Sequence, residues 1–196
     1  MSNNIGILLS GNGSNLRAII DKGLEVSFVA SNNPKALGLK IAKNTNIPSY
    51  SWKNVSVLEE EVLKLILEYD VKLLVLAGYM KSLSKNFVNS LPSRFIVNIH
   101  PSLLPKYKGM NAIKQAIEDS AEYTGVTIHH VNIEMDSGYI IKQERIKINE
   151  NDTAKSLKDR LQKIEHRLYF ETIKFILNKK KKIKVYFFYY FVDNNV

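Results

Sequence analysis

The 196-residue sequence contains no cysteine, which excludes disulfide bonds, thiolate zinc or iron–sulfur sites and a cysteine nucleophile. No apolar run approaches the roughly 20 residues that a membrane-spanning helix needs, so we expect no membrane partner. No basic segment precedes the apolar run at residues 5–9, so we expect no signal peptide and a cytoplasmic location. Hydrophobic residues make up 45% and charged residues 24%, which is typical of a globular domain.

Acidic residues are in the minority, with 19 Asp and Glu against 28 Lys and Arg, for a net charge of +9. Residues 140–196 contribute 14 basic and 7 acidic side chains, so +7 of that charge lies in the last third. A solvated basic surface is the simple interpretation, and attraction for an anionic partner is the alternative. No aromatic RNA-binding motif, zinc finger or basic heptad accompanies the charge, so we expect no nucleic-acid partner.

Short apolar runs alternate with segments of helical periodicity in the first half of the chain. The expected strands are residues 5–9, 26–30, 71–77 and 95–99, and the expected helices are 14–21, 35–43, 58–68 and 84–90. This alternation is typical of βαβ units. It predicts an α/β fold, a single Rossmann-like domain whose mostly parallel central sheet has helices on both faces.

The pattern changes after residue 124. Two strands, at 124–131 and 139–147, predict an antiparallel C-terminal portion of the sheet, and residues 154–177 predict a long amphipathic helix capped by Thr153. We assign residues 1–196 to one domain with a core at about 4–178. The basic and aromatic segment 179–196 is expected to form a terminal strand; a membrane-surface or partner-binding tail is the alternative.

A glycine-rich loop at residues 10–16 lies between the first strand and the first helix. Such a loop presents backbone N–H groups and a helix N-terminus to an anion, usually phosphate. A dinucleotide site would need a third glycine near Leu16 and an acidic residue near Asn32, and both are absent. We therefore favour a small phosphorylated substrate, with a tight turn that binds nothing as the alternative.

Asn98 and His100 end an apolar strand and, two residues apart, face the same side of it. The functional interpretation is a general acid–base imidazole beside an amide that can donate to an oxyanion. A hydrogen-bonded pair without catalytic function is the alternative. Asp136 begins a turn, and beside His100 it would orient the imidazole and stabilise its charged form. His129 and His130 point to opposite faces of one strand. A zinc site would need His100, one of these two and a carboxylate, and their spacing matches no such site, so we expect no metal.

Five motifs, at residues 10–16, 76–80, 98–105, 125–129 and 134–138, occur in the order found in folate-dependent formyltransferases. The chain resembles that family over about residues 4–178. The block Asn-x-His-Pro-Ser-Leu-Leu-Pro marks the family generally. The loop Gly-Asn-Gly-Ser-Asn-Leu resembles the phosphoribosylglycinamide formyltransferase branch. The resemblance implies transfer of a formyl group from 10-formyltetrahydrofolate to the amine of 5′-phosphoribosylglycinamide, in purine biosynthesis.

The resemblance also implies three sets of site residues and no metal. The catalytic set is Asn98, His100 and Asp136. The set for the phosphorylated substrate is Gly13, Ser14, Asn15, Leu16, Arg17, Gln162, Lys163, Ile164 and Glu165. The folate set is Met80, Lys81, Ser82, Leu83, Asn98, Asn132, Ile133, Glu134, Met135 and Asp136. Small molecules are the implied partners, and the protein is expected to be a monomer or a homodimer.

The chain departs from the family pattern at three positions, with Lys81 in place of a common arginine, Ser137 in place of glycine and Asn111 in place of a common histidine. Residues 49–61 also contain no arginine. We expect these changes to alter affinities rather than the chemistry. Another folate-dependent formyltransferase or a formyltetrahydrofolate hydrolase is the nearest alternative. A non-catalytic module that binds nucleic acid through its basic end is the alternative from another class.

Overall fold

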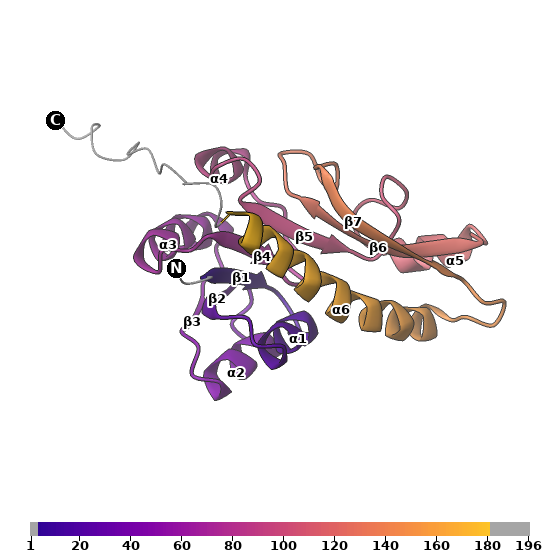
Figure 1. The fold of residues 1–196 in the computed structure, drawn as a ribbon, viewed down its shortest axis with the longest axis horizontal. Coiled ribbons are helices and arrows are strands. Elements are labelled where there is room, and N and C mark those ends of the chain that lie inside the picture. Colours follow the sequence, from indigo (N-terminus) through magenta and orange to yellow (C-terminus); the bar gives the residue numbers. More distant parts are fainter. Residues whose placement is uncertain (1–3, 181–196) are drawn as a thin grey trace.

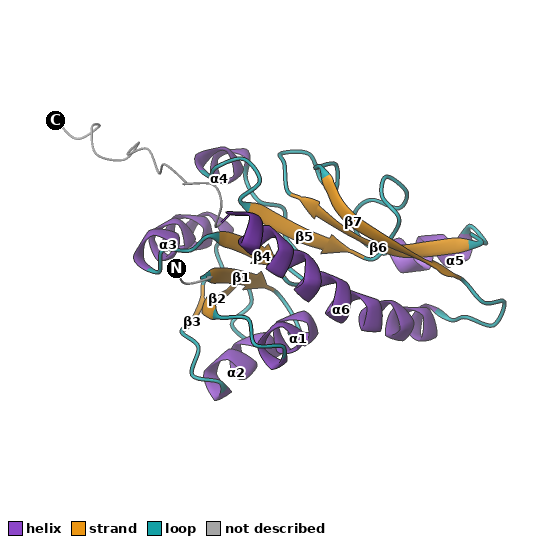
Figure 2. Ribbon diagram, in the orientation of Figure 1, coloured by secondary structure: helices purple, strands orange, loops and turns teal. Residues whose placement is uncertain are grey.

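The computed structural model describes residues 4–180, in which one seven-stranded sheet has helices on both faces (Figures 1 and 2). The sheet order is β3-β2-β1-β4-β5-β6-β7. The strands are β1 (Ile5–Leu9), β2 (Val26–Ser31), β3 (Ser49–Ser51), β4 (Leu73–Leu76), β5 (Ile96–His100), β6 (Tyr123–His130) and β7 (Ile140–Lys147). The helices are α1 (Ser14–Asp21), α2 (Leu37–Asn44), α3 (Val55–Glu68), α4 (Lys85–Ser90), α5 (Ala112–Glu118) and α6 (Ala154–Lys180).

The first five strands pair in parallel, whereas β6 runs antiparallel to both β5 and β7. Successive side chains of a strand point to opposite faces, so β1 contributes side chains to two hydrophobic cores, one on each face of the sheet. Ile5, Ile7 and Leu9 pack in a core with residues of α1 and α6. Leu8 packs in a second core with residues of α3 and α4. Burial on both faces explains why the parallel strands are almost continuously apolar.

Helix α6 crosses the sheet beside β4 and β5 (Figure 1). Its start is capped reciprocally, since Ser156 N donates to Thr153 Oγ1 (3.1 Å) and Thr153 N donates to Ser156 Oγ (2.9 Å). The fully buried Tyr169 hydroxyl lies 2.9 Å from the carbonyl oxygen of Leu76 and 3.0 Å from that of Val97. This helix is therefore hydrogen-bonded to both of the neighbouring strands that lead to the candidate site.

The structure confirms the predicted fold class. It contains two short elements that we did not predict, β3 and α5, and α6 extends beyond its predicted end. The strand β3 has only three residues and no apolar run, and α5 has only seven residues, so both are too short to be identified with certainty from their sequence pattern. Residues 179 and 180, which we predicted to begin a terminal strand, continue α6. The rest of that predicted strand lies outside the described residues, and the assignment of residues 1–196 to one domain stays a prediction.

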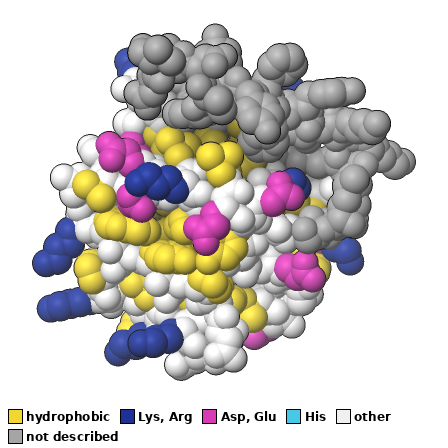
Figure 3. Space-filling view, turned by 90° about the vertical axis from the view of Figure 1, so that its left-hand side faces the viewer, with side chains coloured by type: hydrophobic (Ala, Val, Ile, Leu, Met, Phe, Trp, Pro, Cys, Tyr) yellow, Lys and Arg dark blue, Asp and Glu magenta, His cyan; other side chains and the backbone are white. Residues whose placement is uncertain are grey.

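Figure 3 shows the side of the molecule that lies at the left of Figure 1, where α2 and α3 lie. Apolar side chains are exposed there among charges of both signs, and no histidine is visible on the described surface. Over the described residues as a whole, the exposed apolar side chains include Leu37 of α2 and Leu67 of α3. Within residues 4–180 no helix is long and apolar enough to cross a membrane.

Candidate active site

The loops that follow β1, β4 and β5 meet at one edge of the sheet, because the carboxyl ends of parallel strands lie together. Two of these loops are in direct contact. Ser10 N donates to the carbonyl oxygen of Gly78 (3.0 Å), and Met80 N donates to Ser10 Oγ (2.8 Å). The glycine-rich loop and the segment predicted to hold folate are thus neighbours.

Asn98, His100 and Asp136 come together at the end of β5. His100 Nδ1 lies 3.4 Å from Asp136 Oδ2, and Asn98 Nδ2 lies 3.5 Å from Asp136 Oδ1. The side chains of His100 and Asp136 are only 7% and 9% exposed. Both side chains are largely shielded from water, so solvent and salt weaken their interaction less than they weaken one between exposed groups.

Both ring nitrogens of His100 face acceptors. Nε2 lies 2.7 Å from the carbonyl oxygen of Tyr107, and Nδ1 faces the carboxylate of Asp136. Carbonyl and carboxylate oxygens only accept hydrogen bonds. Each ring nitrogen therefore has an oxygen acceptor toward which a hydrogen on that nitrogen would point.

His129 is a fourth member of the cluster, which sequence reasoning did not assign to the site. It lies directly opposite Asn98 in the β5–β6 ladder, with Nε2 3.2 Å from Asn98 Nδ2 and 3.5 Å from Asp136 Oδ1. Its Nδ1 donates to the carbonyl oxygen of His130 (3.0 Å), which leaves Nε2 toward the site. A polar residue in an apolar strand is the sequence feature that marks His129. Only the strand register, which pairs His129 with Asn98, shows that it belongs to this site.

The carboxylate of Asp136 is strongly stabilised in its charged form. Burial alone would raise its pKa, but hydrogen bonds from His129 and from the Gly109 N–H (2.8 Å), together with the charge of His100, lower the pKa to about 2. Asp136 is therefore an anion at neutral pH, and it supplies the negative charge that an imidazolium at His100 needs.

The loop after β5 is anchored to the antiparallel strands. Thr127 Oγ1 accepts from Leu104 N (3.1 Å) and donates to the carbonyl oxygen of Ser102 (2.6 Å), and Gln143 Nε2 lies 2.8 Å from the same hydroxyl. These bonds are buried or partly buried. They fix the start of the segment that carries Tyr107 and thereby the position of the carbonyl that faces His100.

The glycine-rich loop turns tightly into α1. Gly13 has φ +74°, and a Cβ there would lie 2.6 Å from Gly38 Cα in α2, so only glycine fits. Two contacts tie this loop to α6: Gln162 Nε2 donates to Ser14 Oγ (2.7 Å), and Asn15 Nδ2 donates to Glu165 Oε2 (3.1 Å). The glycine-rich loop is therefore in direct contact with Gln162 and Glu165, two residues of α6 that we expect to bind the phosphorylated substrate.

Asn15 and Glu165 are both poorly solvated. The Oδ1 atom of Asn15 is buried and has no hydrogen-bond partner among residues 4–180. Burial raises the pKa of Glu165, an effect that the hydrogen bond from Asn15 and the charge of Lys158 partly offset. A buried acceptor without a partner and a carboxylate short of solvation are both groups that a polar ligand can satisfy.

The remaining predicted site residues are placed differently. Lys163 and Arg17 are exposed, whereas Leu16 is fully buried in the core and Ile164 packs against that core. On the folate side, Lys81, Ser82, Asn132 and Glu134 are exposed and Leu83 is partly buried. The exposed apolar side chains there are Met80, Ile133 and Met135. Apolar surface on the two predicted folate loops is what a flat aromatic ligand would cover.

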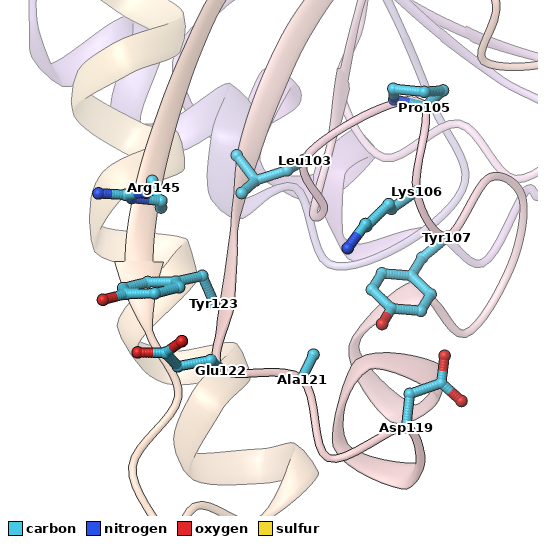
Figure 4. Close-up of a pocket in the computed structure, with 9 residues that line it drawn as sticks. All are labelled: Leu103, Pro105, Lys106, Tyr107, Asp119, Ala121, Glu122, Tyr123 and Arg145. Atoms are coloured by element: carbon cyan, nitrogen blue, oxygen red, sulfur yellow. The ribbon is translucent and has the colours of Figure 1, made fainter.

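A cavity of about 740 Å³ is lined in part by residues of the loop that follows β5 (Figure 4). Its lining includes Lys106, Tyr107, Tyr123 and Arg145, with the Arg145 guanidinium over the Tyr123 ring at 4.4 Å. None of the residues of the His100 cluster lines it. Tyr107 belongs to both places, with its side chain in the cavity and its carbonyl at His100.

Taken together, a buried imidazole–carboxylate pair, an adjacent amide and a glycine-rich loop at the carboxyl edge of the sheet define an α/β enzyme suited to chemistry at a carbonyl group. The family model described as "Formyl transferase" matches residues 3–173, and the chain belongs to that family. The resemblance drawn from the sequence motifs is thereby confirmed.

Two curated relatives and one solved structure illustrate the similarity. A trifunctional purine biosynthetic protein adenosine-3 from Chironomus tentans is 41% identical over 175 residues, which cover 83% of this chain but only 13% of that protein. A phosphoribosylglycinamide formyltransferase from Bacillus subtilis is 35% identical over 182 residues, 87% of this chain and 93% of that one. The crystal structure of phosphoribosylglycinamide formyltransferase from Anaplasma phagocytophilum has a TM-score of 0.86 and 39% identity, with 92% and 89% of the two chains covered.

Proposed function

We propose that this chain transfers the formyl group of 10-formyltetrahydrofolate to the amine of 5′-phosphoribosylglycinamide, a step of purine biosynthesis. Membership of the formyl transferase family and relatives that carry the corresponding name support this proposal. The single observation that carries it is the cluster at the end of β5, where Asp136 contacts both His100 and Asn98. These residues supply the charge and the donors that formyl transfer needs.

The reaction forms a C–N bond between the formyl carbon and the substrate amine, and it breaks the C–N bond between the formyl carbon and N10 of the folate. The substrate amine attacks the formyl carbon, and the carbonyl oxygen becomes an oxyanion that the Asn98 amide and the charged His100 ring stabilise. The tetrahedral intermediate then collapses, and the C–N bond to N10 of the folate breaks with its electron pair returning to N10. One proton leaves the attacking amine and one reaches N10, so no net acid or base is consumed. We assign this proton transfer to His100.

Binding would bring two large substrates into contact across the site. The glycine-rich loop, Gln162 and Glu165 are suited to the phosphorylated substrate, and segments 80–83 and 132–136 are suited to the folate. Holding the amine and the formyl carbon in attack geometry contributes much of the rate enhancement in such reactions. We expect no metal to take part. Within the described residues no three His, Asp or Glu side chains form a group that could hold a metal ion.

The direct test is a spectroscopic assay for the tetrahydrofolate product, with and without 5′-phosphoribosylglycinamide. Formation of product only when both substrates are present supports the proposal. Product formation without the amine would identify a formyltetrahydrofolate hydrolase instead. No product with either mixture, combined with retention of tRNA in a filter-binding titration, would identify a nucleic-acid-binding module.

A further inference from the structure

The segment expected to hold folate, residues 80–83, is a loop whose two ends are fixed by side chains from distant parts of the chain. At its start, Met80 N donates to Ser10 Oγ (2.8 Å), in the glycine-rich loop. Just after its end, Ser84 donates twice to the carboxylate of Glu59 in α3, through N to Oε1 (2.7 Å) and through Oγ to Oε2 (2.5 Å). Neither Ser10 nor Glu59 was among the predicted site residues.

Glu59 is an unusual residue for the inner face of a helix. It is only 6% exposed and makes no ion pair with a cation among residues 4–180. Burying a carboxylate is costly unless hydrogen bonds to the charge compensate for it. Both oxygens are used on one residue, and charge-assisted bonds of this kind are among the strongest in proteins. A carboxylate here therefore fixes Ser84 more firmly than packing of an apolar side chain would.

Ser84 transmits this constraint to the loop and to α4 together. Its Oγ accepts from Phe87 N (3.1 Å) as the N-cap of α4, while the same hydroxyl donates its hydrogen to Glu59. The orientation of the hydroxyl is thus determined from both sides. The residue that directly follows the folate segment thus has both its backbone N–H and its side chain fixed by contacts outside the segment.

Ser10 is fixed in the same way at the other end. Its hydroxyl donates to Asn32 Oδ1 (2.6 Å), which leaves the oxygen to accept from Met80 N. Its carbonyl accepts from Asn33 Nδ2 (3.2 Å), and its N–H donates to Gly78 O (3.0 Å). Ser10 therefore belongs to the glycine-rich loop by sequence and to the folate segment by hydrogen bonding.

We propose that Glu59 and Ser10 are positioning residues that set the affinity for formylfolate by fixing residues 80–83 at both ends, without touching either substrate. This proposal rests on the proposed function. Within residues 4–180 the hydrogen bonds of the Glu59 side chain go to Ser84, on the folate side, so we expect Glu59 to act on the folate alone. Ser10 also lies in the glycine-rich loop, so its removal affects both substrates.

The decisive variant is Glu59→Gln, with Glu60→Gln as the matched control because Glu60 is the next residue of the same helix and is exposed. An amide can accept only one of the two bonds from Ser84. We expect the KM for 10-formyltetrahydrofolate to rise about 10-fold, the usual effect of one lost charge-assisted bond. We expect kcat and the KM for 5′-phosphoribosylglycinamide to stay within about 2-fold of the unmodified protein. Ser10→Ala should raise both KM values.

Amide hydrogen exchange at residues 80–84 gives a readout that does not depend on turnover. We expect faster exchange in Glu59→Gln than in Glu60→Gln, and near-normal exchange and KM in Ser84→Thr, which keeps both donors. An unchanged folate KM, or a parallel loss of kcat, both affinities and thermal stability, would overturn the proposal. If Glu59→Gln does not fold, Ser84→Ala removes the hydroxyl donor from the other side and is judged by the same criteria. Failure of the proposed function would appear in the unmodified protein, as an absence of formylfolate turnover.

Discussion

Nδ1 of His100 lies 3.4 Å from Oδ2 of Asp136, and this pair couples the end of a parallel strand to a turn of the antiparallel part of the sheet. The same carboxylate oxygen accepts from the N–H of Gly109 (2.8 Å), and Nε2 of the imidazole lies 2.7 Å from the carbonyl oxygen of Tyr107. Neither ring nor carboxylate can rotate without losing a hydrogen bond. The relation between the two residues is therefore built into the loops around them.

Removing either partner should abolish most of the activity while the protein still folds. We expect His100→Ala to lower kcat by about 1,000-fold, since in the proposed mechanism this residue both carries the proton and stabilises the oxyanion. Asp136→Asn should lower kcat by about 100-fold, because an amide cannot balance the imidazolium that the proposed mechanism places at His100. Steady-state kinetics with circular dichroism as the folding control would measure this. The exposed Asp159→Asn is the matched control, and near-normal turnover in both site variants would remove the catalytic assignment.

The Asp136 carboxylate should also make the protein sensitive to acid. Its pKa is about 2 in the folded protein against an ordinary value of 3.8, so the folded state favours the anion. The resulting stabilisation, about 2 kcal/mol, is present above about pH 4 and is lost as the pH falls through 2. Urea unfolding at pH 7, 5 and 3 measures the free energy of unfolding of the unmodified protein and of Asp136→Asn. We expect the difference between the two free energies to be about half as large at pH 3 as at pH 7. A difference that is the same at pH 7 and pH 3 would contradict this prediction.

Local patterns predicted most of the fold because the parallel strands are buried on both faces. The apolar runs at residues 5–9 and 95–99 coincide within one residue with β1 and β5, and Thr153 caps α6 as expected. The strand β3 escaped prediction since its three residues pair with β2 without an apolar run of their own. An edge strand of this kind is defined by its neighbour rather than by its composition.

Part of the candidate site, namely Asn98, His100 and Asp136, could be predicted from the sequence. Asn98 and His100 stand out because polar residues end an apolar strand, and the family motif pointed to Asp136. His129, Tyr107 and Ser10 could not be assigned, since their contacts with the site depend on strand register and loop geometry. Register is a property of the assembled sheet, and no periodicity along one strand specifies it.

Substitution of Glu165 should weaken substrate binding without lowering the stability of the fold. Burial raises the pKa of this carboxyl, so its ionisation weakens the folded state as the pH rises toward neutral. Glu165→Gln removes that cost while its amide oxygen can still accept from Asn15. We expect the free energy of unfolding at pH 7 to equal or exceed that of the unmodified protein, and the KM for 5′-phosphoribosylglycinamide to rise about 10-fold.

The control for this variant is Glu171→Gln, farther along α6, where the carboxylate pairs with Lys142 at the surface. It should change neither KM, because exposed pairs contribute little and this one lies away from the glycine-rich loop. Substrate kinetics and urea unfolding of both variants, measured side by side, give the comparison. A Glu165→Gln protein that is clearly less stable, with an unchanged KM, would show that the residue acts in folding alone.

The glycine-rich loop allows a test within one short segment. Gly13 has φ +74° and no room for a Cβ against Gly38, whereas a Cβ on Gly11 would meet nothing within 4 Å. We expect Gly13→Ala to lower the free energy of unfolding by about 1–3 kcal/mol and to raise the KM for the phosphorylated substrate, because α1 would be displaced from α2. Gly11→Ala should change stability by less than about 1 kcal/mol. Equal losses in the two variants would mean that the close approach of Gly13 to α2 does not determine the shape of this loop.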